Sequence, residues 1–406
     1  MSDARPMHVL IAGAGVAGLE AALALRTLAE ERVTVELVAP EAEFTYRPLA
    51  VAEPFGVGEV RRFPLTKLAE TAGAPLTRGA VESVDPERRV AITAEGKELA
   101  YDAILLALGA RAIEGVAGAL TFRGPEDAPA LADLMKETRE GRVQSIVFTL
   151  PSGASWTLPL YELALLSAVH LADAGMGEVR LDVITPEPRP LQLFGSAAVD
   201  VVTDLLGLHG IGLRTNTTTM EVATGSVRLS SGEEIAADRV VALPRIEGPR
   251  LGGIPHDANG FIATDTHGRV LDTEHVYAAG DLTDFPVKQG GLATQQADAA
   301  AEAIAAEAGA PIDPSPFTPI LRGLLLTGLT PRYLRAEPTG TASITDTEPL
   351  WWPPAKIVGR HLAPFLASYL HVDDSPPRLP AGSVVEIEVE LEQGTAGSWS
   401  PLARNQ

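Results

Sequence analysis

Runs of apolar residues alternate with amphipathic stretches through most of the chain. HVLIAGAG (8–15) predicts a buried strand that ends in glycines, LEAALALRTLAEE (19–31) predicts a helix, and VTVELVAP (33–40) predicts a second strand. YDAILLALGA (101–110) predicts another buried strand. Apolar runs this continuous are typical of parallel strands that are covered by helices on both faces. The first part of the chain is therefore expected to form an α/β unit.

A second series of elements repeats this order without a close repeat of residues. SIVFTL (145–150) and VRLDVITPE (179–187) predict strands, and LYELALLSAVHLADAG (160–175) and AAVDVVTDLLGLHG (197–210) predict helices. The repeated order predicts two Rossmann-like, doubly wound domains.

The first of these domains is expected to be discontinuous. A strand at HVYAAGD (275–281) and an alanine-rich helix at GLATQQADAAAEAIAAEAG (291–309) repeat the strand-to-glycine-to-helix order of the first series. We therefore assign residues 1–118 and 251–315 to the first domain and residues 119–250 to the second.

A smaller C-terminal α/β region, residues 316–406, follows a proline-rich connection. PILRGLLLTG (319–328) and PRYLRAE (331–337) predict a hairpin, and SVVEIEVELE (383–392) predicts a further strand. KIVGRHLAPFLASYL (356–370) predicts a helix.

Composition narrows the functions that this fold can serve. The net charge of −21 argues against binding nucleic acid or adhering broadly to an anionic membrane. The absence of cysteine excludes disulfides, iron–sulfur clusters, thiolate zinc sites and thiol redox catalysis. No apolar run approaches the ~20 residues that span a bilayer, and a strand begins almost at the first residue, so we expect a cytoplasmic protein. HVDD (371–374) precedes a proline-rich turn and the other histidines are scattered, so no metal site is expected.

A glycine-rich turn follows the first strand and opens the first helix. The first glycine permits a tight turn, the second lets the backbone approach a pyrophosphate, and the third lets helix and strand pack closely. The helix N-terminus adds partial positive charge. The turn therefore predicts a dinucleotide site, and its residues fit the pattern GxGxxG: Gly13, Ala14, Gly15, Val16, Ala17 and Gly18.

The acidic residue that commonly ends the second strand of an NAD site is missing. Ala39 and Pro40 stand there, and Glu36 has the wrong parity within the strand. Glu41 is the carboxylate that could still reach a ribose. This departure weakens any assignment of NAD to the turn.

A second cofactor contact is predicted where the late strand ends at Gly280 and Asp281. The aspartate can hydrogen-bond a cofactor hydroxyl at the edge of the sheet. Gly290 and Gly291 then open a helix whose positive end can face an electron-rich ring. Taken alone, Gly-Asp after a strand is more often only a turn.

Taken together, these motifs resemble those of flavoproteins built from two dinucleotide-binding domains. In that superfamily GxGxxG holds the FAD pyrophosphate, and a late strand that ends in Gly-Asp holds the ribityl chain. Ala107, Leu108 and Gly109 match a third motif of the superfamily, a strand that ends in (A/S)-x-G. The resemblance implies bound FAD.

A closer resemblance is to sulfide:quinone oxidoreductases, flavocytochrome sulfide dehydrogenases and type II NADH dehydrogenases. VELVAPEAEFTYRPL (35–49) is similar to their segment near the flavin. The resemblance implies that Arg47 and Pro48 lie close to the isoalloxazine, and that the backbone of Val81 receives the adenine.

FPVKQGG (285–291) resembles the Pro-Lys-x-Gly turn of the same families. The resemblance places Lys288 and Gln289 beside the pyrimidine end of the flavin. A cation at that position would stabilise an anionic reduced flavin. The alternative for Lys288 is a solvated lysine in a turn.

PSGASWTLPLYELALL (151–166) stands where a second nucleotide-binding turn would lie. In sulfide:quinone oxidoreductases the similar turn reads Gly-Ala-Ser-Cys, so Trp156 takes the place of a sulfur-handling cysteine. Cysteine-mediated oxidation of sulfide is therefore chemically ruled out. Pro151, Trp156 and Pro159 also replace an open glycine-rich turn with bulk and missing N–H groups. We expect a remodelled site that has lost nicotinamide binding.

Trp156 and Tyr161 each leave two alternatives. Trp156 either packs between the domains or forms an aromatic wall over the flavin, where it would stack on a planar substrate. The Tyr161 hydroxyl is either a proton donor or an ordinary helix-cap contact. Residues 153–157 also resemble the GxSxG turn of serine hydrolases, but the branched Thr157 does not suit that strained turn.

The run LWWPPAKIVGRHLAPFLASYLH (350–371) predicts a helix that begins near Pro354 and is kinked at Pro364. Residues 351–370 are one candidate for a weak peripheral membrane contact, because the resembling families rest C-terminal helices on membranes. The alternative is a helix that covers the flavin domain or forms a homodimer interface. The expected apolar face contains Val358, Leu362, Phe365, Leu366, Tyr369 and Leu370, and the polar face contains Lys356, Arg360 and His361.

The leading hypothesis is an FAD-dependent oxidoreductase with a scaffold similar to sulfide:quinone oxidoreductase and a cysteine-independent mechanism. It would act on a small molecule or a quinone that enters near Trp156, Tyr161 and Lys288, the candidate catalytic residues. One alternative is an NAD(P)H-dependent quinone or acceptor reductase. Another is an FAD-bound binding or sensing protein without turnover.

Overall fold

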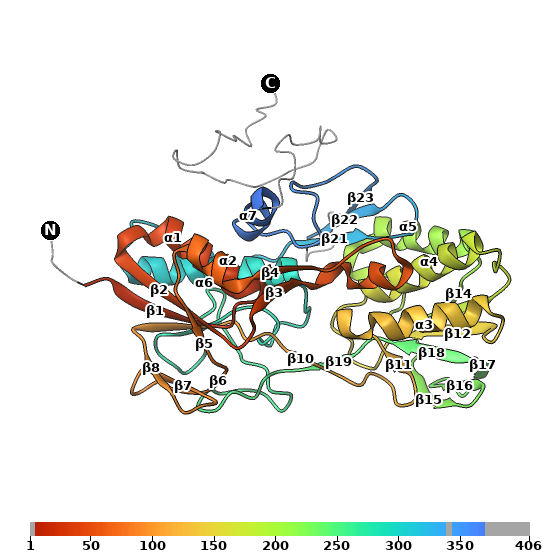
Figure 1. Cartoon of the computed structure of the whole chain (residues 1–406), viewed down its shortest axis with the longest axis horizontal. Helices are drawn as coiled ribbons and strands as arrows, with labels where there is room; N and C mark the ends of the chain where they lie inside the picture. Colours follow the sequence, from red (N-terminus) through yellow and green to blue (C-terminus); the bar gives the residue numbers. More distant parts are fainter. Residues whose placement is uncertain (1–4, 338–342, 370–406) are drawn as a thin grey trace, which may run out of the picture.

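The computed structural model describes residues 5–337 and 343–369 of the chain. These residues form two lobes, each built on a parallel sheet, with a C-terminal sheet and helix packed beside them (Figure 1). The strand expected at 383–392 and the HVDD segment at 371–374 lie outside the described residues.

The first lobe is built on a five-stranded sheet in which every neighbouring pair is parallel. On the central strand, Val9 and Ile11 pack into the core on one face, while Leu10 and Ala12 pack into the core on the other. Burial on both faces explains the unbroken apolar runs of the sequence. The order across the sheet is β20 (Val276–Ala278), β9 (Ala103–Leu106), β1 (Met7–Ala12), β2 (Val33–Ala39) and β5 (Leu76–Arg78).

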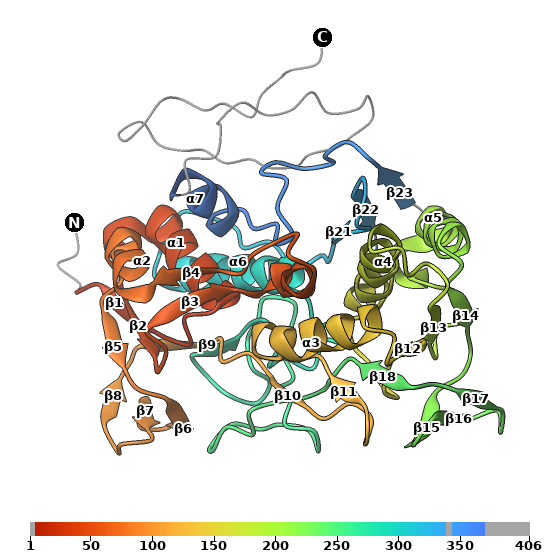
Figure 2. The ribbon, with the colours of Figure 1, turned by 45° about the vertical axis from the view of Figure 1, so that its right-hand side comes forward.

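Helices α1 (Val16–Ala29) and α6 (Gly290–Glu307) pack along each other in this lobe (Figures 1 and 2). Both helices bury rows of alanine, and these small side chains allow their backbones to approach closely. The lobe also contains η1 (Glu30–Arg32), β3 (Glu43–Tyr46), η2 (Arg47–Phe55), β4 (Arg61–Pro64), α2 (Leu65–Ala72), β6 (Val81–Asp85), β7 (Val90–Thr93) and β8 (Glu98–Ala100).

The second lobe repeats the architecture of the first. Its parallel sheet has the order β11 (Leu120–Thr121), β18 (Arg239–Ala242), β12 (Ser145–Thr149), β13 (Arg180–Ile184) and β14 (Gly212–Arg214). The α/β fold with two Rossmann-like sheets is therefore confirmed, while the domain limits stay a prediction. The other elements are η3 (Pro125–Asp127), α3 (Ala128–Arg139), α4 (Leu158–Asp173), η4 (Gln192–Phe194), α5 (Gly195–Leu208), β15 (Thr219–Ala223), β16 (Ser226–Leu229) and β17 (Glu234–Ala236).

Each lobe carries a three-stranded antiparallel sheet at the corresponding point of its sequence, β6-β7-β8 in the first and β15-β16-β17 in the second. The antiparallel sheet of the first lobe begins at Val81, and the preceding residues 76–78 pair with β2. Between the lobes, β10 (Arg111–Ile113) and β19 (Arg245–Glu247) pair antiparallel. The two chain segments that connect the lobes are therefore hydrogen-bonded to each other.

The C-terminal region starts with an antiparallel sheet of β21 (Leu321–Leu325), β22 (Arg332–Ala336) and β23 (Ser343–Asp346), which confirms the predicted hairpin. The predicted helix over 356–370 is wrong in its first half. Residues 351–361, which we call the strap, are irregular, and α7 spans only Leu362–Tyr369.

The physical reason for the shorter helix is that the backbone of the strap bonds to the first lobe. The Ile357 N–H donates to Tyr46 Oη (3.0 Å), and Thr294 Oγ1 donates to the Val358 carbonyl (2.8 Å). Pro364 therefore lies in the first turn of α7, where a missing N–H costs nothing, and does not kink a longer helix.

The apolar residues of the strap and of α7 pack inward. Trp351 and Val358 form a small core with Tyr333, while Leu362 and Leu366 join the core of the first lobe. Within the described residues, α7 thus covers the first lobe, which is the alternative to membrane contact. Over the described ranges, no helix has the length and apolar character needed to cross a bilayer.

Candidate active site

The glycine-rich turn between β1 and α1 has the shape of a phosphate cradle. A Cβ at Gly13 would lie 2.3 Å from the Ala107 carbonyl oxygen, and one at Gly18 would lie 1.9 Å from that of Gly13. A Cβ at Gly15, in contrast, meets nothing within 4 Å. Gly15 begins α1, and no side chain caps that helix. Open space beside uncapped N–H groups fits the pyrophosphate of FAD.

Strand β20 brings Gly280 and Asp281 to the same side of the first lobe. Gly280 has a φ of 89°, and a Cβ there would approach the side chains of Ala17 and Ala293 at 3.2 and 3.5 Å. The Asp281 carboxylate lines a cavity, and no described residue donates a hydrogen bond to it. Burial raises the pKa of Asp281, and the nearby Lys288 opposes this shift. A half-buried carboxylate that faces a cavity fits the hydroxyl groups of the ribityl chain.

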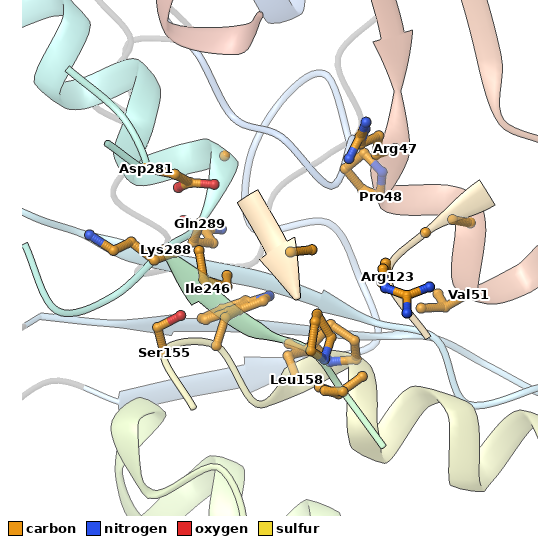
Figure 3. Close-up of a pocket in the computed structure, with 18 of the residues that line it drawn as sticks. Arg47, Pro48, Val51, Arg123, Ser155, Leu158, Ile246, Asp281, Lys288 and Gln289 are labelled. Carbon is orange, nitrogen blue, oxygen red and sulfur yellow. The ribbon is translucent and has the colours of Figure 1, made fainter. Parts of the chain in front are cut away.

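Lys288 is not the solvated lysine of the alternative interpretation, because only 7% of it is exposed. Its Nζ donates to the Thr283 carbonyl and lies 4.0 Å from the centroid of the Phe261 ring. Burial lowers its pKa to about 8. Figure 3 shows the side chain running away from the middle of the cavity, so its ammonium group does not point at the cavity centre.

Gln289 ties the start of α6 to the C-terminal sheet. Its Oε1 accepts from the Leu292 N–H (3.0 Å) and its Nε2 donates to the Arg322 carbonyl (2.8 Å). A Cβ at Gly290 would lie 3.0 Å from the side chain of Ile357. The helix end that was expected to face the flavin is thus close to the strap.

A cavity of ≈ 300 Å³ brings together both lobes and the C-terminal region. In Figure 3, Asp281, Lys288 and Gln289 lie on one side, and Arg47, Pro48 and Arg123 lie on the other. The strap closes the cavity with Lys356 and Ile357. The apolar part of the cavity lining includes Trp156, Leu158 and Ile246.

The cavity wall contains a buried ion pair between the lobes and the strap. Lys356 Nζ lies 2.6 and 2.7 Å from the two carboxylate oxygens of Glu162, and donates to the Pro48 carbonyl at 3.2 Å. The Glu162 side chain is fully buried and that of Lys356 is 7% exposed. Burial raises the pKa of Glu162, and Lys356 opposes the shift. The pair places a proton-bearing group beside Pro48, the residue expected near the isoalloxazine.

Trp156 lines the cavity and also packs edge-on against Phe194, with ring centroids 5.8 Å apart. The ring therefore packs on the second lobe and still presents surface to the cavity, and its stacking on a substrate over the flavin stays a prediction. Ser155 Oγ is buried and has no hydrogen-bond partner within residues 5–337 and 343–369, so no base in that part of the chain activates it as in a serine hydrolase.

Tyr161 does not reach the cavity, although the sequence suggested a catalytic role. Its side chain is fully buried and its hydroxyl donates to Glu187 Oε2 at 2.5 Å. Thr157 and Thr185 donate to the same carboxylate at 2.9 and 3.0 Å. Burial raises the pKa of Tyr161, and the charge of Glu187 adds to the shift. A hydroxyl held this way does not serve a substrate in the cavity.

The remaining sequence-predicted residues do not meet in one place. Glu41 is exposed after β2, while Val81 is buried at the start of β6, beside a register shift in the pairing with β7. Their contacts with FAD stay predictions. Sequence reasoning missed Glu162 and Lys356, which are almost 200 residues apart and meet only through the fold.

Two Rossmann-like sheets, a glycine cradle and a cavity at their junction define an FAD-dependent oxidoreductase. The chain belongs to the pyridine nucleotide-disulphide oxidoreductase family, whose sequence profile matches residues 7–305. Members of this family are flavoproteins that bind FAD, and the cradle and Asp281 described above fit that cofactor.

Known relatives are reductases of several kinds. The chain is 27% identical to rubredoxin-NAD(+) reductase of Pseudomonas putida over 68% of this chain and 71% of that protein. It is 24% identical to sulfide-quinone reductase of Aquifex aeolicus over 69% of each chain. The solved sulfide:quinone oxidoreductase of Aquifex aeolicus covers 84% of this chain and 86% of its own, with a TM-score of 0.76 and 20% identity. The structural likeness shows a shared fold, and the expected resemblance is confirmed.

Proposed function

We propose that this oxidoreductase exchanges electrons between FAD and a quinone, or a similarly small planar molecule, held in the central cavity. The observation that carries the proposal is the buried Lys356–Glu162 pair in the wall of that cavity. The apolar surface of Trp156, Leu158 and Ile246 suits a flat ring. One relative of the chain is a sulfide-quinone reductase, which also supports a quinone.

Bound FAD would supply the two-electron chemistry. The reduction of a quinone to a quinol also requires two protons, of which one would arrive with the hydride that reduced FAD supplies and the other must come from the cavity wall. Lys356 Nζ carries protons at the cavity wall, and the carboxylate of Glu162 holds the ammonium group in place. In this proposal Lys356 donates to a quinone oxygen, and the pair recovers the proton from water.

We further propose that NAD(P)H is not the electron donor through the second lobe. Glu187 follows β13, at the position where an NAD-binding domain commonly places the carboxylate that binds a ribose. Here that carboxylate accepts hydrogen bonds from Tyr161, Thr157 and Thr185. Trp156 and Pro159 line the cavity beside the turn. These internal contacts occupy three of the roughly four acceptor sites of the carboxylate, which supports the predicted loss of nicotinamide binding.

The quinone proposal is tested by reducing the bound flavin with light and EDTA under argon, then mixing it with menadione or a short-chain ubiquinone. The return of the oxidised flavin band should be rapid and saturable. Lys356→Met should slow it at least tenfold, while Lys67→Met, which removes an exposed lysine of α2, should leave it unchanged. Equal rates for both variants would remove Lys356 from the mechanism.

The donor is tested by an anaerobic titration with NADH and then NADPH. We expect the oxidised flavin spectrum to persist. Rapid bleaching would favour the alternative of an NAD(P)H-dependent acceptor reductase. A flavin that neither nicotinamide nor any quinol reduces, and that no quinone reoxidises, would favour a binding or sensing protein.

Location and assembly remain predictions. The net charge of −21 and the inward packing of the strap agree with a cytoplasmic protein and do not require membrane contact. Binding to vesicles with a quinone-rich bilayer, measured by flotation, would test a peripheral association, and light scattering would test a homodimer.

A further inference from the structure

The end of the strap and the start of α7 are held by a buried carboxylate that takes no part in the proposed chemistry. Glu20 of α1 is fully buried, and its two oxygens accept from the N–H groups of His361 (2.8 Å) and Leu362 (2.7 Å). A Cβ at Gly359 would lie 2.5 Å from Glu20 Oε2, so the strap approaches as closely as a glycine permits. Glu20 thus fixes the strap three to six residues beyond Lys356.

Asp298 of α6 lies beside Glu20, on the neighbouring helix. Asp298 Oδ1 is buried and has no hydrogen-bond partner among the described residues. A cavity of ≈ 330 Å³ is lined by Asp298, Glu302 and Arg360. This second cavity gives the carboxylate pair a route for exchanging protons with water.

The other charged and titratable groups around the pair do not neutralise it. Arg360 of the strap is half-exposed and bonds to Glu302 of α6 at 3.1 Å. Burial lowers the pKa of His361 to about 4, so its imidazole is neutral near pH 7. Two adjacent buried carboxylates without a full counter-charge do not both ionise readily.

Two adjacent buried carboxylates of this kind can share one proton. Burial raises the pKa of Glu20 to about 7. Burial, together with the charge of Glu20, raises the pKa of Asp298 well above its ordinary range. With one proton between them, the Asp298 carboxyl can donate to Glu20, which keeps its two bonds to the strap. When the last proton leaves, the two carboxylates repel each other.

We propose that Glu20 and Asp298 form a proton-sharing clasp that seats the strap and thereby positions Lys356 at the cavity. The clasp itself follows from the contacts above, whereas its effect on turnover rests on the proposed function. Both residues are positioning residues, because they act on the cavity only through the strap.

The sign of the pH dependence follows from the direction of the shifts. A carboxyl group with a raised pKa in the folded protein binds its proton more tightly there than in the unfolded chain. The contribution of the pair's last proton to stability is complete below the ordinary pKa of a carboxyl group, near 4.5, and falls as the pH rises through the raised pKa of the pair. The strap should be firmly seated in mild acid and loosen in alkali.

The test is hydrogen exchange of the strap, followed by mass spectrometry and corrected for the intrinsic rate at each pH. In the wild-type holoprotein, protection of the amides of His361 and Leu362 should fall at least tenfold between pH 6 and pH 9. Asp298→Asn keeps a donor to Glu20 and removes one ionisation, so its protection should fall less than twofold. Glu307→Gln, on the same helix and bonded to Tyr277, is the matched control and should behave like the wild type.

Glu20→Gln should lower the protection of these amides at every pH, because a neutral amide oxygen is a weaker acceptor than a carboxylate. If it fails to fold, Asp298→Asn still decides the question. Protection that does not depend on pH, or that falls equally in wild type and Asp298→Asn, would overturn the clasp.

A second readout links the clasp to the cavity. The pH profile of flavin reoxidation by menadione should fall in parallel with strap protection, and Asp298→Asn should extend the active range to higher pH. The expected exchange result without any reoxidation would support the clasp and count against the proposed function. A profile unchanged by Asp298→Asn would show that the clasp does not position Lys356.

Discussion

The fold does not require a glycine at position 15, but the absence of a side chain there leaves room for a ligand. Its φ of −81° lies in the extended region that any residue adopts, and a Cβ there would point into open space. Gly15→Ala should therefore leave the melting temperature of the apoprotein within about 2 °C of wild type, since replacing a favoured N-cap residue by alanine costs only about 1 kcal/mol and the chain is large. FAD should bind at least tenfold more weakly, which fluorescence titration of the apoprotein would measure.

The matched comparison is Gly13→Ala. A Cβ at that position would clash with the Ala107 carbonyl at 2.3 Å, and the φ of 106° is strained for alanine. This variant should be destabilised even without FAD. Wild-type FAD affinity in Gly15→Ala would show that the pyrophosphate lies elsewhere.

For Tyr161, a candidate catalytic residue in the sequence, we expect a substitution to lower stability and to leave activity nearly unchanged. Tyr161→Phe removes one of three hydroxyl donors to Glu187 and leaves Thr157 and Thr185 in place. We expect a loss of about 1–2 kcal/mol in the free energy of unfolding, measured in urea. The rate of flavin reoxidation by menadione should stay within twofold of wild type, because the hydroxyl faces away from the cavity. A drop of more than tenfold would restore Tyr161 as a proton donor.

At the scale of elements, the strap and α4 are joined by one buried ion pair. Lys356→Met leaves the Glu162 carboxylate buried without a counter-charge, which should cost about 3–5 kcal/mol in the free energy of unfolding. The double variant Lys356→Met/Glu162→Gln should recover most of this loss, because the glutamine can still accept from the Leu326 N–H that now bonds to Glu162 (2.8 Å). Urea denaturation of both variants would measure the difference. Additive losses would mean that the two groups do not interact.

The sequence predicted elements well wherever a periodic pattern coincided with burial. β1 carries apolar residues on both faces and α6 is rich in alanine, and both were found within a few residues of their expected limits. The irregular strap was wrongly predicted as helix, because the helical spacing of Val358 and Leu362 was accidental. The bonds from Tyr46 and Thr294 that hold its backbone come from residues distant in sequence, and no local pattern records them.

The same reasoning explains which site residues the sequence predicted. Glycines at close approaches leave a local signature, and the cradle from Gly13 to Gly18 was confirmed in its geometry. The Glu162–Lys356 pair has no such local signature. In the sequence, a glutamate within a helix and a lysine after two prolines both look like exposed surface residues. Their burial depends on how the C-terminal region crosses the cavity.

The whole molecule carries 53 acidic and 32 basic side chains, a net charge of −21. This excess produces a self-repulsion that favours the expanded, unfolded chain. Salt bridges such as Arg88–Glu98, in which both side chains are more than half exposed, contribute only about 0–1 kcal/mol each. The buried Lys356–Glu162 pair is shielded from added ions, so salt should act mainly on the repulsion.

Raising NaCl from about 10 to about 150 mM shortens the screening length from ~30 to ~8 Å. We therefore expect the melting temperature at pH 7.5 to rise by several degrees, measured by calorimetry. The control is the same experiment at pH 5, close to the sequence pI of ≈ 4.8, where the net charge nearly vanishes and the effect of salt should disappear. An equal rise at both pH values would point to a general salt effect on burial, and a fall at pH 7.5 would mean that the surface salt bridges outweigh the repulsion.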